Sequence, residues 1–191
     1  GKVSFTTQSH LQGIAVNGIS VRANATTVDA NAIWGFDSLG EYTHLVGKFH
    51  SDNIELSLAL LDYTSSIRDS DVNTDFDVMW RDNIYSPDIE SLGGDIAWEF
   101  GEGHIAEVSD QGARIFSLFS LDSLRRKLVL DFRDVFQEGI FFNDFEGDFS
   151  IDNGIAVTEN AYMDGVAGGV DVVGSVNLST QELDYYITFS P

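Results

Sequence analysis

The chain has 191 residues, of which 43% are apolar and 12% aromatic, and it carries a formal charge of -21 at pH 7. This apolar content excludes a disordered acidic tail, because such tails combine high charge with few apolar residues. With only ten Lys and Arg residues, the chain is poorly suited to nucleic acid or to an anionic membrane surface, since both are bound through basic side chains.

The sequence offers few residues for a metal or cofactor. It has no Cys, so zinc and iron–sulfur sites lose their usual ligand. Its His residues are scattered rather than spaced by one helical turn. No segment approaches the roughly 20 apolar residues that a membrane-spanning helix needs. We therefore expect no metal, no cofactor and no membrane-spanning helix within the sequence.

Strand-like alternation begins in the first third of the chain. Between residues 28 and 36 the even positions are apolar and face away from Asp29 and Asn31, which is the period of a half-buried strand. Residues 53–63 have a helical pattern, and the alternation returns over residues 72–80 and 92–100. Since the chain has 18 Gly and only two Pro, we expect hairpins and a mainly β fold.

A second helix is expected at residues 113–126. Most of one side of it is apolar, and Arg125, Arg126 and Lys127 place positive charge at the negative end of its dipole. A helix this apolar is usually buried against a sheet, a partner or lipid. Its apolar residues include Ile115, Phe116, Leu118 and Phe119.

The last fifty or so residues, about 140–190, predict a meander of four strands. Phe141, Phe145, Phe149 and Ile151 alternate on one side before Asn153-Gly154, a pair that suits a tight hairpin turn. We assign Ile155, Val157, Ala161 and Met163 to one face of the returning strand. Two further alternating segments follow at residues 170–178 and 183–189.

Motifs for catalysis are missing. The stretch 69–75 resembles the start of a calcium loop, but it has Thr74 where the loop needs Gly and Trp80 where it needs Glu. Asp131, Asp134, Glu138 and Asp144 could include a carboxylate pair for glycoside hydrolysis, although 31 acidic residues make such proximity uninformative. We therefore expect no enzyme, and a carbohydrate-active enzyme is the weakest alternative.

The segment from Gly112 to Gly165 resembles the C-terminal region of the AsmA-like family of envelope proteins. The resemblance is carried by Gly112-Ala113-Arg114 at the start of the helix, Leu130-Asp131-Phe132, Gly139-Ile140-Phe141-Phe142, and the turn pairs Asn153-Gly154 and Asp164-Gly165. It extends more loosely over most of the chain.

The resemblance implies a fold and a function. The fold would be a curved antiparallel sheet or β-groove (trough) with one or two short amphipathic helices. Residues 1–191 would form one β-rich domain, the C-terminal portion of a longer periplasmic protein anchored in the inner membrane by an N-terminal helix. That protein would carry phospholipid from the inner to the outer membrane of a Gram-negative envelope, with an envelope or outer-membrane protein as a further partner. A fragment of such a sheet is also expected to self-associate through its exposed edges.

The expected groove lining is the apolar face of the predicted strands, and the helix would lie at the groove end or at a membrane. The alternative is a β-sandwich binding module, such as a lectin or adhesin domain, in which the same residues form a closed core. The candidate lining residues are Trp34, Phe76, Trp80, Trp98, Phe145, Phe149, Val157, Met163, Val172 and Ile187. The basic residues Arg125 and Arg126 could meet lipid phosphate, although compensation of the helix dipole explains them equally well.

Overall fold

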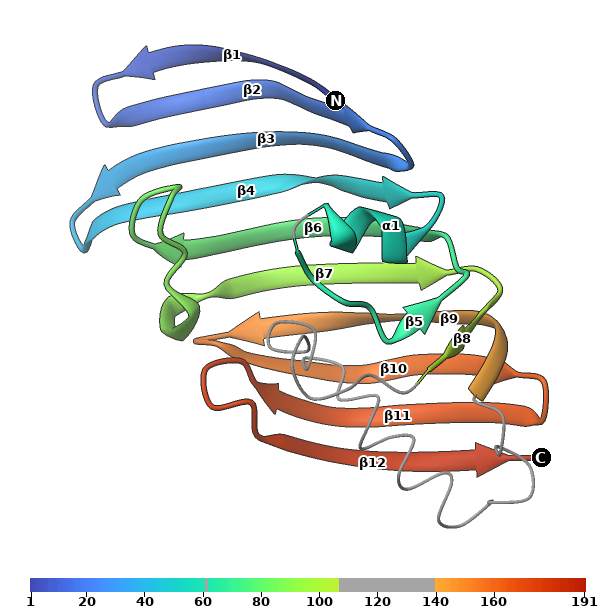
Figure 1. Cartoon of the computed structure of the whole chain (residues 1–191). Coiled ribbons are helices and arrows are strands. Elements are labelled where there is room, and N and C mark those ends of the chain that lie inside the picture. Colours follow the sequence, from blue (N-terminus) through green and yellow to red (C-terminus); the bar gives the residue numbers. More distant parts are fainter. Residues whose placement is uncertain (61, 107–139) are drawn as a thin grey trace.

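The computed structural model describes residues 1–60, 62–106 and 140–191. In these residues the strands form one antiparallel sheet, with α1 lying on one of its faces (Figure 1). The elements in chain order are β1 Lys2–His10, β2 Gly13–Ala23, β3 Thr26–Asp37, β4 Gly40–Ser51, α1 Ile54–Ala59, β5 Ile67–Arg68, β6 Val72–Arg81, the 3-10 helix η1 Ile89–Ser91, β7 Gly93–Phe100, β8 Gly103–Ile105, β9 Ile140–Asp152, β10 Ile155–Gly165, β11 Gly168–Asn177 and β12 Leu183–Ser190.

Strand order follows the sequence almost throughout. The main path runs β1-β2-β3-β4-β6-β7-β9-β10-β11-β12, and the short β5 and β8 pair beside it, with β8 also bonded to β9. Tight turns join most neighbours, which is the usual arrangement of a meander. Because the described strands belong to a single sheet, the structure does not favour the β-sandwich alternative.

The expected secondary structure is confirmed where the structure describes it. Strands occupy the alternating segments, and α1 falls within the helix expected at residues 53–63. This helix is shorter than expected, because Tyr63 N–H bonds back to Leu58 C=O and Asp62 has a left-handed φ of 60°. The helix expected at 113–126 lies outside the described residues.

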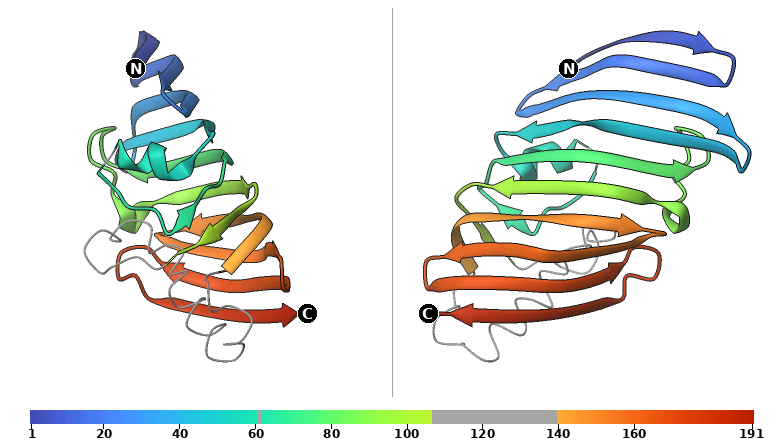
Figure 2. Two further views of the ribbon diagram at one scale, coloured as in Figure 1. Left: turned by 45° about the vertical axis from the view of Figure 1, so that its right-hand side comes forward. Right: turned by 180° about the vertical axis from the view of Figure 1, so that it is seen from behind.

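The sheet has one apolar and one polar face. We call the apolar face, on which α1 lies, the inner face, and the opposite one the outer face (Figures 1 and 2). Directly paired residues of an antiparallel sheet share a face, so Phe100, Phe145, Met163 and Val170 form one continuous inner row. All four are buried. The inner face therefore carries the core.

A β-bulge in β10 changes which side chains point inward. Glu159 and Asn160 together oppose Asp148 of β9, so β10 has one extra residue at this point. Before the bulge Ala156 and Thr158 are buried, and after it Ala161 and Met163 are buried. Val157 consequently shares the outer face with Ser150 and is 39% exposed. Its expected place beside Met163 on the apolar face was wrong.

A second irregularity corrects the start of β9. The pairing of β9 with β10 shifts between Asp144 and Phe142, and Phe142 rather than Phe141 is buried. Phe141 is exposed and stacks on His104 with ring centroids 5.1 Å apart. Strict alternation therefore predicted Phe141 on the buried face, which was wrong. An extra residue in β9 moves the residues that precede it to the opposite face of the sheet.

Candidate functional site

The inner face brings together the expected lining residues, with Val157 as the exception. Trp80, Trp98, Phe145, Phe149, Met163 and Val172 are buried on it, and Trp34, Phe76 and Ile187 are partly exposed. They come from seven strands between β3 and β12. The alternation of each strand turns these side chains to one side, and the antiparallel pairing then joins them into rows.

Aromatic rings fill the inner face over β7 and β9. The Trp98 ring lies 4.8 Å from the Phe149 ring and 6.1 Å from the Phe145 ring, measured between centroids. Phe145 also stacks with Phe100 at 6.0 Å. Gly147 makes room for Trp98, since a Cβ there would lie 2.7 Å from Trp98 Cζ2. These side chains form a packed cluster at this part of the face.

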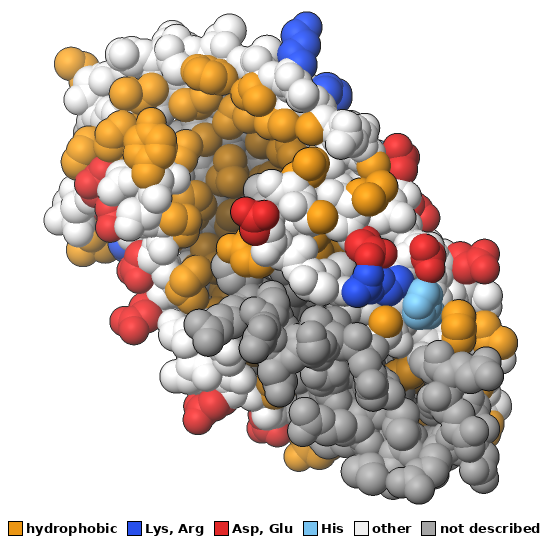
Figure 3. Space-filling model, in the orientation of Figure 1, with side chains coloured by type: hydrophobic (Ala, Val, Ile, Leu, Met, Phe, Trp, Pro, Cys, Tyr) orange, Lys and Arg blue, Asp and Glu red, His pale blue; other side chains and the backbone are white. Residues whose placement is uncertain are grey.

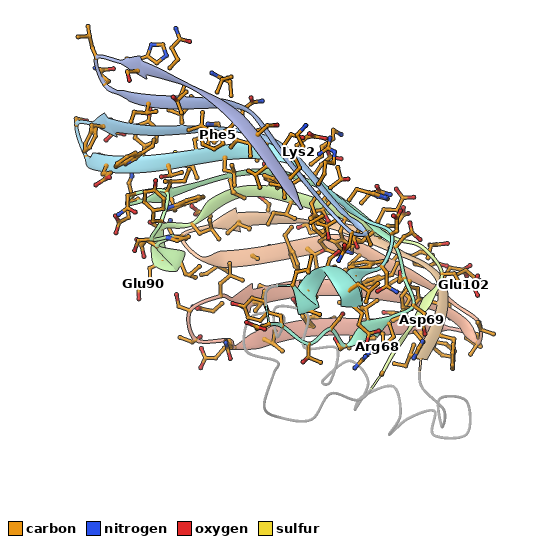
Figure 4. The ribbon with its side chains drawn as sticks, turned by 45° about the horizontal axis from the view of Figure 1, so that its top comes forward. Lys2, Phe5, Arg68, Asp69, Glu90 and Glu102 are labelled. Carbon is orange, nitrogen blue, oxygen red and sulfur yellow. The ribbon has the colours of Figure 1, made fainter. Side chains whose placement is uncertain are left out.

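The inner face is open at the other end of the sheet. Val3 and Phe5 of β1 are 63% and 60% exposed, and every residue of β1 is exposed. Figure 3 shows apolar side chains gathered in a hollow beside the part of the chain that carries β1 to β4. Figure 4 places Lys2 and Phe5 on β1, at the opposite end of the sheet from the C-terminal strands.

Trp34, on the inner face of β3, has a polar partner. Its indole N–H donates to the Glu41 carboxylate, and its ring meets Tyr85 edge-on at 6.5 Å. On the outer face, Arg81 of β6 donates to Asp37 of β3 at 2.8 Å and lies 6.0 Å from the Tyr42 ring. This bond holds the pKa of the Asp37 carboxyl below its usual value. Trp34 therefore has its polar partner, Glu41, on the inner face, whereas the Arg81–Asp37 pair lies on the outer face.

The outer face carries the acidic residues. Asp29, Asp75, Asp95, Asp148 and Asp171 lie on it and are exposed. Most described cations are already paired with carboxylates: Arg22 with Asp29, Lys48 with Asp75, Arg68 with Glu55 and Arg81 with Asp37. Within residues 1–60, 62–106 and 140–191, no three His, Asp or Glu side chains are placed to hold a metal ion.

Tyr185 is a partly buried phenol on the inner face. This β12 residue pairs with Gly174 on the inner face, and burial raises the pKa of its phenol to about 12. A phenolate is disfavoured there because the charge would lose its hydration. The surroundings of Tyr185 are therefore suited to apolar groups rather than to ionised ones.

Sequence reasoning missed the residues that form the open end. Val3 and Phe5 alternate with polar residues on β1, and Ile14, Val16, Ile19 and Val21 point inward from β2. The alternation in β2 is broken at Asn17-Gly18, where Gly18 has a φ of 60° and β2 carries one extra residue relative to β3. Reading the two halves of β2 separately would have found them.

Some of the expected site falls outside the described residues. Ile115, Phe116, Leu118, Phe119, Arg125 and Arg126 all lie there, so the role expected for them stays a prediction. Among the described helices, none has the length and apolar character needed to cross a bilayer.

The fold and the face define an open antiparallel sheet with one apolar and one acidic side, which is the class expected for an AsmA-like envelope protein. Comparison with protein families places the chain more narrowly: the family model described as "YhdP protein" matches residues 1–191, and the chain belongs to this family. The expected AsmA-like resemblance is thereby confirmed.

A curated relative is the intermembrane phospholipid transporter YhdP of Escherichia coli (strain K12), which is 33% identical over 163 residues. The match covers 85% of this chain and 13% of the relative, so the chain spans only a small part of that protein's length. No solved structure matches the chain significantly.

Proposed function

We propose that this chain shelters phospholipid acyl chains on the inner face of its sheet, as part of phospholipid transport between the inner and outer membranes. The observation that carries the proposal is the apolar inner face, which continues across the strands and is open at β1. Membership of the YhdP family and the phospholipid transporter named among its relatives support it.

The energetics fit such a role. A lipid tail in water is unfavourable by about 0.8 kcal/mol per methylene, so an acyl chain needs roughly 10 kcal/mol of shelter while it crosses an aqueous gap. An apolar face with an acidic reverse side supplies this shelter and stays soluble on its outer surface. No bond is made or broken, so the proposed function is non-enzymatic and needs no cofactor.

The proposed setting is the periplasm. Passage between two membranes requires a protein that stands in the aqueous space between them, and the relative is named for transport of that kind. We further propose that an N-terminal helix, outside this chain, anchors the protein in the inner membrane. An envelope or outer-membrane protein is the proposed partner at the far end.

The test is photocrosslinking in Gram-negative cells that express the protein. A photoreactive amino acid replaces Trp34 on the inner face or Ile33 on the outer face. These neighbours on β3 are both apolar and at least partly exposed, but they point to opposite sides of the sheet. We expect phospholipid crosslinks from position 34 and far fewer from position 33.

The same experiment separates the alternatives. Equal crosslinking from both positions would indicate non-specific contact with membranes. No lipid at position 34 in a folded protein would favour a binding module with a closed core and would overturn the proposal.

A further inference from the structure

Exposure of the inner face changes along the sheet. Val3 and Phe5 on β1 are mostly exposed, and the inward residues of β2, such as Val16 and Val21, are partly exposed. Towards the C-terminal strands the exposed fraction falls to 1% at Met163 and 0% at Val170. The inner face therefore has an open part that is widest over β1 and β2 and narrows over β3 and β4, where Ala32 and Thr43 are buried but Val28 and Trp34 are partly exposed. It has a closed part over β7 and β9 to β11, with β6 as the border.

The segment that joins β4 to β6 stands on the inner face near this border. It contains α1, whose Ile54 and Leu58 are buried in the same apolar cluster as Val72, Trp98 and Phe100. Figures 1 and 2 show α1 in front of the middle strands, on the inner side of the sheet. This helix is thus part of the closed core and lies beside the hollow of Figure 3.

Polar bonds fix the segment in place. Ser57 of α1 shares hydrogen bonds of 2.6 Å with both Thr26 of β3 and Ser51 of β4. The backbone N–H of Ile54 donates to Ser70 C=O at 3.0 Å. Because Ser51, Ser57 and Ser70 are buried, breaking these bonds would leave polar groups without partners in an apolar setting. The segment is therefore a fixed partition rather than a loose loop.

The closed part leaves little space for an acyl chain. The Trp98 ring lies over Gly147, and Phe145 packs against Phe100 and Met163. Side chains in such a cluster are packed at the density of an organic crystal, so a lipid tail could enter only by displacing them. In the open part the inward side chains of β1 and β2 remain accessible.

We propose that the lipid path within this chain ends at α1. Acyl chains of a phospholipid bind the inner face of β1 to β4, whereas the inner face of β7 and β9 to β11 is a closed core that takes no lipid. This inference rests on the proposed function and assigns it to one part of the sheet. The expected lining residues Trp98, Phe145, Phe149, Met163 and Val172 then belong to the core rather than to the lipid path.

Two valines allow a matched test. Val28 and Val172 lie in one row across the sheet, linked through Phe49, Thr74, Trp98 and Ala161, but Val28 is in the open part and Val172 in the closed part. Since the chain has no Cys, Val28→Cys and Val172→Cys each create one thiol of nearly unchanged size. The full chain is labelled with N-ethylmaleimide, with and without monomeric dihexanoylphosphatidylcholine.

We expect Val28→Cys to react at least about tenfold faster than Val172→Cys, because a closed position reacts only through local opening. The lipid should slow the reaction of Val28→Cys several-fold and leave Val172→Cys unchanged. Val173→Cys, on the exposed outer face of the same strand, should react rapidly with or without lipid. Thermal unfolding monitored by circular dichroism shows that each variant is folded, and Val176→Cys replaces Val172→Cys if the latter unfolds.

The outcomes distinguish the two proposals. Rapid labelling of both Val28→Cys and Val172→Cys, with lipid protecting both, would overturn the partition and leave the proposed function intact. Rapid labelling of Val28→Cys that lipid does not slow would contradict lipid binding by this chain, and with it both proposals.

Discussion

At the scale of single residues, Gly147 decides whether Trp98 can pack. A Cβ at position 147 would lie 2.7 Å from Trp98 Cζ2 and 2.8 Å from Ala161 Cα. The second contact is to backbone and cannot be relieved by a rotamer change. The absence of a side chain at Gly147 therefore keeps the aromatic cluster of β7 and β9 closed.

We predict that Gly147→Ala lowers the free energy of unfolding by about 1–3 kcal/mol through overpacking. The measurement is urea denaturation followed by Trp fluorescence. Gly93→Ala is the matched control on β7, since the nearest atom to a Cβ there is Ile151 O at 3.4 Å. Equal stability of both variants would show that Trp98 is not held against Gly147.

His50 provides a pH-dependent test at the same scale. Its Nδ1 lies 2.8 Å from Asn73 Oδ1 and its Nε2 lies 3.1 Å from Asp52 Oδ1. Both bonds raise the pKa of His50 above the ordinary value of 6.5, and the bond to Asn73 has the larger effect. Because the folded-state pKa is raised, the stabilisation is fully present below pH 6.5 and is lost as pH rises through the folded-state pKa.

We predict that Asn73→Ala lowers the pKa of His50 towards its ordinary value, measured by NMR titration of the imidazole. Asn31→Ala, which changes an outer-face amide elsewhere in the sheet, should leave that pKa unchanged. An unchanged His50 pKa in Asn73→Ala would rule out Asn73 as the main cause.

At the scale of elements, the bulge in β10 sets which side chains are buried. Asn160 fixes it through two bonds to Asp148: its side-chain oxygen accepts from the Asp148 backbone N–H at 3.1 Å, and its amide nitrogen donates to the carboxylate. Because of the bulge, Ala156 rather than Val157 shares the inner face with Met163, and Ala156 is buried whereas Val157 is exposed.

We predict that Ala156→Asp destabilises the fold by about 3 kcal/mol or more, because it buries an unpaired carboxylate. Val157→Asp should change the free energy of unfolding by less than about 1 kcal/mol, as expected for an exposed position. Thermal or urea unfolding measures both. The opposite order of sensitivity would mean that Val157 faces inward and that the bulge is absent.

The start of α1 is a second feature at this scale. Asn53 caps the helix, and its side-chain oxygen accepts from Leu56 N–H at 3.0 Å. Asn53→Ala should destabilise the helix by about 0.5–2 kcal/mol, while Asn53→Asp keeps the acceptor. Hydrogen exchange of the α1 amides is the measurement, and we expect faster exchange in Asn53→Ala alone. Equal exchange in both variants would show that the cap does not hold this helix.

At the scale of the whole molecule, β1 is an edge strand of the sheet that the described residues form. Every residue of β1 is exposed, and an exposed edge strand offers unpaired N–H and C=O groups to another chain. We therefore predict concentration-dependent self-association of the 191-residue chain, measured by analytical ultracentrifugation.

Phe5→Lys should weaken this association, because a charged residue on an edge strand blocks edge-to-edge pairing. Ile33→Lys, which adds the same charge to the outer face within the sheet, should have a smaller effect. An oligomer that is equally sensitive to both changes would have to form through another surface.

The sequence by itself determined the mainly β fold and the strands at residues 28–36, 72–80 and 92–100 and in the C-terminal meander, but it did not specify β1, β2 or β4. Alternation over residues 72–80, for example, specified both a strand and its wet face, because side chains on a strand have a strict period of two. The family resemblance could also be recognised from sequence, and comparison confirmed it. Alternation is a property of a single strand, so it can be read without knowing which strands are neighbours in the sheet.

Only the tertiary structure decided at which residues the inward and outward positions of a strand exchange. It also decided which part of the apolar face is open. The extra residues at Asn17-Gly18 and Glu159-Asn160 are visible only against a paired strand, since a bulge is a mismatch between two strands and not a property of one. The burial of Met163 and the exposure of Phe5 likewise depend on what packs above them. Alternation gives each residue a face, but contacts between distant segments determine whether that face meets a core or remains accessible.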